Sequence, residues 1–182
     1  MNFHRYTVFD IETTGLYPQR GHRIIEIGAV SIQNDAIANE FSILISCGRN
    51  ISKKAQSING ITHDMLINQP SPEEALTRFI DFISNSILIA HNAKFDIRFL
   101  RYELSRLGLK LLNRYICTLE LSRKKYPDLP NHKLETVAGH LLGEKMNGFQ
   151  HHRALDDARL TAMVWLEMSR NSERIPRSFA RD

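Results

Sequence analysis

Two carboxylates separated by one residue, Asp10 and Glu12, lie in a segment that reads as a β-strand running into a turn at Gly15. Side chains on a strand alternate between its faces, so both acids point to one side while Phe9 and Ile11 point to the core. Neighbouring buried carboxylates repel each other and lose hydration. A divalent cation that prefers oxygen ligands, Mg²⁺ or Mn²⁺, would remove both penalties. The alternative is an exposed strand end with two solvated acids.

A third acid, Asp96, is expected in the first turn of a helix that follows a short buried strand at 87–90. Sites in open α/β folds form where strands pass into helices. Phe95 and Phe99 flank Asp96 in the helical pattern, which indicates a partly dry environment, and Asn92 is close enough to contact a substrate. The competing interpretation is that an acid in a first helical turn only favours the helix dipole.

A fourth acid, Asp157, opens the last long helix and shares its face with an apolar set, so it is expected to point inward. The set is Leu160, Thr161, Val164 and Met168. Asp156 shares a more polar face and is expected at the surface. His152 stands five residues before Asp157 and cannot share its helix face, so we expect it on a preceding loop that can swing toward the site. Alternatively, His151 and His152 are solvated loop residues without a role.

Together, four inward carboxylates and one loop histidine suit the hydrolysis of a phosphodiester by two divalent ions, which lie about 3.5 to 4 Å apart in such sites. Asp10 is best placed to bridge both ions. Glu12 and Asp157 would complete the site of the ion on the nucleophile side, and Asp96 would hold the second ion through water. His152 would take the proton from the attacking water, because histidine side chains titrate near physiological pH.

The elements that must position these residues follow from hydrophobic periodicity. Three early strands joined by short loops predict an antiparallel meander, and two later strands alternate with helices. The expected strands are 5–11, 24–32, 36–46, 87–90 and 115–118. A short helix is expected at 52–57, further helices begin at Thr62, Ser71 and Ala93, and the chain is mainly helical from Leu119. The predicted fold class is therefore α/β, with one mixed five-stranded sheet flanked by helices on both faces.

The 182 residues, 42% hydrophobic and 24% charged, fit one soluble domain with a core. The net charge of +4 permits an anionic partner such as nucleic acid. Cys47 and Cys117 fit no metal-binding spacing and no disulfide framework, so a cytoplasmic location is expected. No apolar run approaches the roughly 18 residues of a membrane span, and neither a signal peptide nor a membrane partner is expected. We expect a domain at 1–170 and a loose basic tail at 171–182.

Three segments in this order resemble the three exonuclease motifs of the DEDDh (DnaQ-like) family: DIETTGL at 10–16, HNAKFD at 91–96 and HRALDD at 152–157. That family includes the proofreading epsilon subunit of bacterial DNA polymerase III. The resemblance spans about residues 5 to 167 and implies a ribonuclease H-like fold. It also implies 3′→5′ exonuclease activity on nucleic acid, two Mg²⁺ or Mn²⁺ ions and nucleoside 5′-monophosphate products. His152 marks the DEDDh branch, since the sister branch has tyrosine near this place.

The resemblance further implies residues that hold the 3′-terminal nucleotide, although family members often have histidine where this chain has Asn59. The implied set is Thr13, Thr14, Gly15, Leu16, Ile58, Asn59, Asn92 and Phe95. Turn chemistry after a strand is the alternative for the threonines and Leu16. The segment 131–136 also matches polymerase-associated members, and we interpret it first as the start of a helix and second as a substrate contact.

The leading hypothesis is an exonuclease that acts on DNA 3′ ends, alone or with a DNA polymerase subunit. An RNA-trimming exonuclease of the same fold is the runner-up, because the choice depends on how the site meets the 2′-hydroxyl. Two other classes compete. A binding module without catalysis would be favoured by the loss of one acid, but all four are present. An adaptor would need a docking segment, for which only 171–182 is available.

Overall fold

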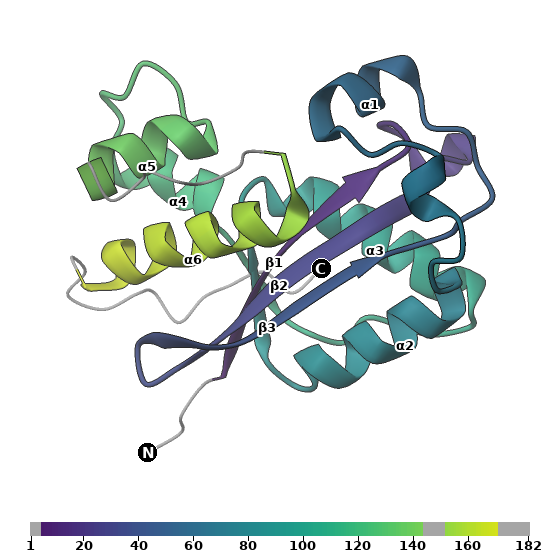
Figure 1. The fold of residues 1–182 in the computed structure, drawn as a ribbon. Helices are drawn as coiled ribbons and strands as arrows, with labels where there is room; N and C mark the ends of the chain where they lie inside the picture. Colours follow the sequence, from purple (N-terminus) through teal and green to yellow (C-terminus); the bar gives the residue numbers. More distant parts are fainter. Residues whose placement is uncertain (1–4, 144–151, 171–182) are drawn as a thin grey trace.

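The computed structural model describes residues 5–143 and 152–170 and is built on one five-stranded sheet of order β3-β2-β1-β4-β5. Figure 1 shows β3, β2 and β1 side by side. The central strand β1 (Tyr6–Thr13) pairs antiparallel with β2 (Ile24–Gln33) and parallel with β4 (Ile87–Ala90). At the edges, β3 (Ala36–Leu44) is antiparallel to β2, and β5 (Tyr115–Cys117) is parallel to β4. The predicted mixed sheet, an antiparallel meander followed by parallel strands, is confirmed.

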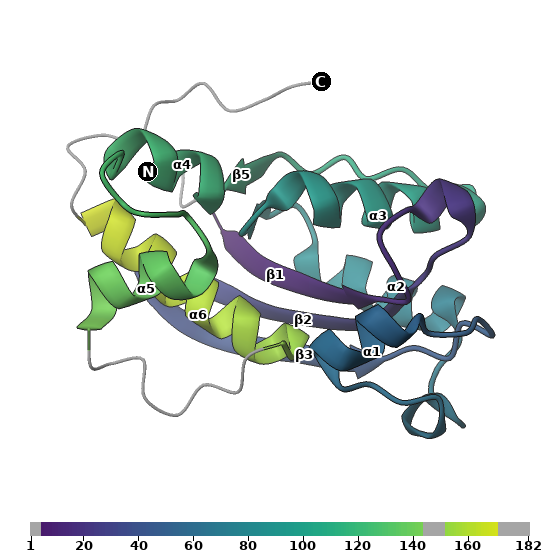
Figure 2. The ribbon, with the colours of Figure 1, turned by 90° about the horizontal axis from the view of Figure 1, so that it is seen from above.

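Helices cover both faces of this sheet, as predicted (Figures 1 and 2). On one face lie α2 (Pro72–Ile83) and α3 (Ala93–Arg106). On the other face lies α6 (Ala154–Arg170), which packs against β1 and β2 and is joined there by the neighbouring α4 and α5. The remaining helical elements are α1 (Lys53–Asn59), α4 (Thr118–Lys125), α5 (Leu134–Leu142) and the short 3₁₀ turns η1 (Pro18–Arg20) and η2 (Asp64–Leu66).

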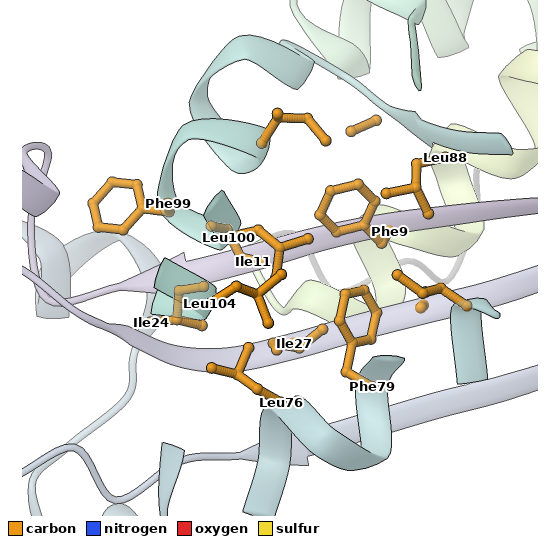
Figure 3. Packing of buried hydrophobic residues seen from close by; sticks show 14 of the residues in the cluster. Phe9, Ile11, Ile24, Ile27, Leu76, Phe79, Leu88, Phe99, Leu100 and Leu104 are labelled. Atoms are coloured by element: carbon orange, nitrogen blue, oxygen red, sulfur yellow. The ribbon is translucent and has the colours of Figure 1, made fainter. Parts of the chain in front are cut away.

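The alternation of β1 between its two faces determines where the acids lie. Phe9 and Ile11 are buried in the larger apolar cluster, where Phe9 packs against Phe79 of α2 (Figure 3). Val8 belongs to the cluster on the opposite face, which includes Trp165 of α6. Asp10 and Glu12 share the face of Val8, so the strand directs both carboxylates toward the side that α6 covers.

Local sequence signals account for most of the boundaries. Asn34 and Asp35 adopt positive φ angles of 52° and 58°, which suits a two-residue hairpin between β2 and β3. The Ser71 hydroxyl accepts a hydrogen bond from the backbone N–H of Glu74 at 3.2 Å and caps α2. Two predictions need correction. The helix expected from Thr62 is only the 3₁₀ turn η2, and Thr118 begins α4 rather than ending β5.

Thr118 leaves the strand because its buried hydroxyl has partners at the carboxyl end of the sheet. It lies 3.0 Å from Nδ1 of His91 and 3.4 Å from the Ala90 carbonyl. The predicted tail at 171–182 lies outside the described residues, so the division into domain and tail stays a prediction. Among the helices of the described ranges, none combines the length and the apolar character that crossing a bilayer requires.

Candidate active site

Three carboxylates meet where β1 passes under the start of α6. Asp10, Glu12 and Asp157 each offer one oxygen, and these three oxygens all lie within 4.8 Å of one another. Asp10 and Glu12 come from β1, and Asp157 comes from the first turn of α6. The residues that share the helical face of Asp157, among them Leu160 and Thr161, are buried, as predicted.

Asp96, in the first turn of α3, is only 3% exposed and lies beside this group. Burial raises the pKa of its carboxyl well above the usual value, although hydrogen bonds from its own backbone N–H and from that of Ile11 act in the opposite direction. Burial also raises the pKa of Asp10, and the charges of Asp96, Glu12 and Asp157 raise it further. The structure therefore brings all four predicted acids to one place.

Such a group is unfavourable unless positive charge compensates it. Burial raises the pKa of Glu12 to about 8, while a hydrogen bond from the Asn59 side chain and the charge of Arg153 act in the opposite direction. Each electrostatic interaction that acts on Asp10 raises its pKa. Clustered carboxylate oxygens are the ligands that Mg²⁺ and Mn²⁺ prefer, so the residues present fit divalent cations.

His152 precedes α6 and is tied directly to the acidic group. Its backbone N–H donates to Oδ2 of Asp157 at 3.1 Å, and its φ of 66° lies in the left-handed region. This conformation turns the chain sharply before α6 begins at Ala154. His152 is exposed and lines one cavity together with Asp10 and Asp157, so its imidazole is accessible to a molecule held at the carboxylates.

An ion pair with a buried glutamate anchors the residue after His152. Glu26 of β2 is 2% exposed and accepts hydrogen bonds from Nη2 of Arg153 at 2.7 Å and from Nε of Arg153 at 3.2 Å. It also accepts from the backbone N–H of Ala154 at 3.1 Å. In the β1–β2 register, Glu26 stands opposite Glu12. Glu26 thus ties the start of α6 to the strand beside the acids.

A cavity of about 380 Å³ opens on the Glu12 side of the group, and six of the residues predicted to hold a terminal nucleotide line it. They are Thr13, Gly15, Leu16, Ile58, Asn59 and Phe95. The ring of His22 closes one wall, and a side chain at Gly15 would collide with that ring at 2.7 Å. Leu16 and Ile58 are each about half exposed, at 52% and 48%.

The other two predicted substrate residues occupy different places. Thr14 is buried and does not line this cavity. Its hydroxyl accepts from the backbone N–H of Arg23 at 2.9 Å, and its carbonyl accepts from the N–H of Ser52, so it joins the β1 turn to the start of α1. Asn92, with a φ of 64°, lines a second cavity instead.

This second cavity, of about 910 Å³, opens on the other side of the carboxylates. One wall carries Asp10, Asp157 and His152, and the opposite wall carries polar and basic side chains of α4, α5 and the loop between them. The opposite wall includes Arg123, Asn131, His132, Lys133 and Glu135. Oδ1 of Asn131 accepts from the N–H of Lys133 and from the Thr136 hydroxyl, which agrees with the interpretation of this segment as a helix start.

Sequence reasoning missed Glu26, Arg153, His22 and Arg123, and it took the segment of Lys133, 131–136, as a substrate contact only in second place. A glutamate inside the otherwise apolar run 24–30 was a usable signal, because a buried acid requires a partner. No comparable signal marked Arg123, since charged residues near helix ends are common at protein surfaces.

The chain matches the RNase_T family, described as Exonuclease, over residues 7–165. It is 47% identical over 162 residues to the DNA polymerase III PolC-type of Thermotoga petrophila, covering 88% of this chain and 12% of that protein. It is 35% identical over 164 residues to the DNA polymerase III subunit epsilon of Aquifex aeolicus, covering 90% of this chain and 79% of that protein. The chain therefore spans only about an eighth of the length of the PolC-type relative.

The fold is also shared with a solved structure. The nuclease domain of 3′hExo, a DEDDh family member bound to rAMP, superposes with a TM-score of 0.78 over 93% of this chain and 94% of that one, at 22% identity. At this level of identity the likeness concerns the fold. It agrees with the ribonuclease H-like architecture expected from the three motifs.

Proposed function

The chain belongs to the RNase_T exonuclease family, and we propose that it is a metal-dependent 3′→5′ exonuclease that releases nucleoside 5′-monophosphates from DNA 3′ ends. The observation that carries this proposal is the group of Asp10, Glu12 and Asp157, whose oxygens lie within 4.8 Å of one another between two cavities. Residues 1–170 would form the exonuclease domain.

We assign the cation ligands to the acids of this group. Asp10, Glu12 and Asp157 would hold one Mg²⁺ or Mn²⁺, and Asp96 beside Asp10 would help to hold a second. Such ions, when bound, supply positive charge to the scissile phosphate and lower the pKa of a bound water. The contribution of the chain is to fix four oxygen donors on one strand and at two helix starts, so that they need no rearrangement.

His152 is proposed as the general base. Its backbone is fixed to Asp157 by the 3.1 Å hydrogen bond, while its exposed side chain is accessible from the larger cavity. A water held at the carboxylates would lose its proton to this imidazole as it attacks the terminal phosphodiester. The bond from phosphorus to the 3′-oxygen of the preceding nucleotide then breaks, that oxygen takes a proton from solvent to become the 3′-hydroxyl of the shortened strand, and the terminal nucleoside 5′-monophosphate leaves.

The choice of DNA rests on the relatives, which are named as DNA polymerase III proteins. We propose on the same ground that a DNA polymerase subunit is a partner and that the chain acts in the cytoplasm, with which the free thiols of Cys47 and Cys117 are compatible. In this setting the exonuclease would remove terminal nucleotides during replication or repair.

A time course of digestion in Mg²⁺ tests the proposal. Single-stranded DNA and RNA oligomers of one sequence, labelled at the 5′ end, should give ladders that shorten from the 3′ end, much faster for DNA. Asp157→Asn should remove activity, while the matched control Asp156→Asn should retain it, because Asp156 instead pairs with Arg159 at 2.8 Å. Faster RNA ladders would reassign the chain to RNA trimming. No ladder from either oligomer with the fold intact would refute the exonuclease assignment.

A further inference from the structure

The two cavities on either side of the carboxylates differ in size and chemistry. The smaller, at about 380 Å³, is lined mainly by apolar side chains such as Leu16, Ile58 and Phe95, together with the basic side chains of Arg20 and Lys54. The larger, at about 910 Å³, has the basic side chains of Arg123 and Lys133 on the wall that faces the acids. Glu12 borders the first cavity, and Asp10 and Asp157 border the second. A phosphodiester placed at the carboxylates would therefore have one cavity on each side.

The basic wall of the larger cavity is held in place by hydrogen bonds. Nε2 of His91, at the end of β4, donates to the backbone carbonyl of His132 at 2.8 Å. The ring of His132 in turn lies 3.0 Å from the Ser122 hydroxyl of α4. These bonds fix the loop between Arg123 and Lys133 against the carboxyl end of the sheet. The wall is consequently preorganised relative to the acids on β1.

The charges on this wall are available to a ligand. Within residues 5–143 and 152–170, Arg123 and Lys133 are exposed and neither forms an ion pair, whereas Arg153 near the acids is bound to Glu26. Glu135 is the acid on the same wall, and Asp10 and Asp157 lie opposite. A polyanion that entered this cavity would be repelled by those acids, so cations on the facing wall would offset the repulsion.

The chemistry of a nucleic acid strand matches this asymmetry. The terminal nucleoside beyond the scissile phosphate carries no further phosphate, so its base and sugar suit apolar walls. The strand on the 5′ side carries one negative charge per nucleotide, so it needs cations in a cavity that is long enough for several nucleotides. Its length also needs the larger, more extended space. The mainly apolar lining of the smaller cavity and the greater volume of the larger one therefore favour one direction in which a strand can lie across the carboxylates.

We propose that Arg123 and Lys133 bind the phosphates of the strand on the 5′ side of the scissile bond, which makes the larger cavity a strand-binding subsite separate from the terminal-nucleotide cavity. This inference rests on the proposed exonuclease function. It adds Arg123 and Lys133 as the residues that bind the rest of the nucleic acid strand, as distinct from its terminal nucleotide. Arg123 and Lys133 then govern the KM for a strand, while the chemistry at the carboxylates does not depend on them.

Two substrates of different length test this inference. The p-nitrophenyl ester of thymidine 5′-monophosphate occupies only the carboxylates and the smaller cavity, and its hydrolysis releases coloured p-nitrophenolate. An oligothymidylate labelled at its 5′ end occupies both cavities. The test variant is the double substitution Arg123→Gln/Lys133→Gln. The matched control is Lys110→Gln/Arg114→Gln, which removes the same charge beside Ser86 and Ile87, at the opposite end of β4.

We expect the test variant to raise the KM for the oligonucleotide about tenfold, to hydrolyse the ester at the wild-type kcat/KM, and to have a weaker salt dependence of KM. The slope of log KM against log salt should fall by about 0.7 for each phosphate of the single strand that the variant no longer neutralises. An unchanged oligonucleotide KM, or an equal decrease in kcat/KM on both substrates, would overturn the inference while the exonuclease function stands. Failure of the wild-type chain to hydrolyse either substrate would overturn both.

Discussion

Gly28 of β2 lies under the first turn of α6 and permits the helix to approach the sheet closely. A Cβ atom at Gly28 would lie 2.1 Å from the carbonyl carbon of Ala154 and from the backbone nitrogen of Leu155. Ordinary contact of a Cβ atom begins near 3.4 Å, so Gly28→Ala requires the strand and the helix start to separate by about 1.3 Å. The obstructing atoms are backbone, which cannot rotate out of the way as a side chain would.

The magnitude follows from this geometry. Overpacking in a well-packed core costs about 1 to 3 kcal/mol. We expect the upper end, about 3 kcal/mol of unfolding free energy, because α6 packs along both β1 and β2. The displaced helix start carries His152 and Asp157 away from Asp10. A misplacement of about 1 Å at a catalytic site lowers the rate by about 100-fold, so kcat should fall by that factor.

Urea denaturation and the kcat for a saturating DNA oligomer measure the two effects separately. Gly108→Ala serves as the control, because Gly108 has a φ of 72° and open space where a side chain would lie. Its cost is the left-handed backbone of an alanine, about 1 to 2 kcal/mol, and kcat should stay at the wild-type value. If Gly28→Ala kept both the wild-type kcat and the wild-type unfolding free energy, the close packing of α6 on β2 would be wrong.

Three further outcomes are expected. His152→Ala should lower kcat by about two to four orders of magnitude, whereas His151→Ala should change kcat little. Single-turnover assays would check both variants. A large loss in His151→Ala with little loss in His152→Ala would show that His151 is the general base. Glu26→Gln should lower kcat about tenfold with little change in the KM for DNA, because Glu26 positions the start of α6. An unchanged kcat would show that Glu26 has no positioning role. In EDTA, the unfolding free energy should fall as pH rises from about 5 to 8. Glu12 has a pKa of about 8 when folded and an ordinary value of 4.5, so the folded chain binds more protons over this range. Glu12→Gln should lessen that slope, of which Asp10 and Asp96 supply the remainder, and an unaltered slope would contradict the burial of Glu12.

Periodicity alone predicted the orientation of the acids proposed as cation ligands. The period of two in β1 placed Asp10 and Glu12 on one face, and the helical period of α6 separated Asp157 from Asp156. These predictions succeeded because each concerns the residues of a single element. The resemblance to the three motifs then predicted that the acids of three separate elements share one site, which periodicity cannot predict.

The supporting contacts could not be predicted in this way, because each joins segments far apart in the chain. Glu26 and Arg153 are 127 residues apart, and His91 and His132 are 41 apart. Pairing such residues requires the register of the β1–β2 hairpin and the path of the loop after α4, and neither follows from local pattern. The boundary at Thr118 was wrong for the same reason, since its hydroxyl contacts His91, which follows the neighbouring strand β4.

Glu26 illustrates why such supporting residues are informative about function. Its charge raises the pKa of both Asp10 and Glu12, so it adds to the repulsion within the acidic group. Its position opposite Glu12 is therefore electrostatically unfavourable for the acidic group. The compensating feature is geometric: Glu26 binds Arg153 and the Ala154 N–H, and so fixes the chain on either side of the helix start that follows His152. If Glu26 serves to position the start of α6, Glu26→Gln should have two effects. It should remove the repulsion between Glu26 and Glu12 in the metal-free protein, and it should lower kcat. If Glu26→Gln instead lowered the unfolding free energy and lost kcat only because less of the chain was folded, Glu26 would serve folding alone.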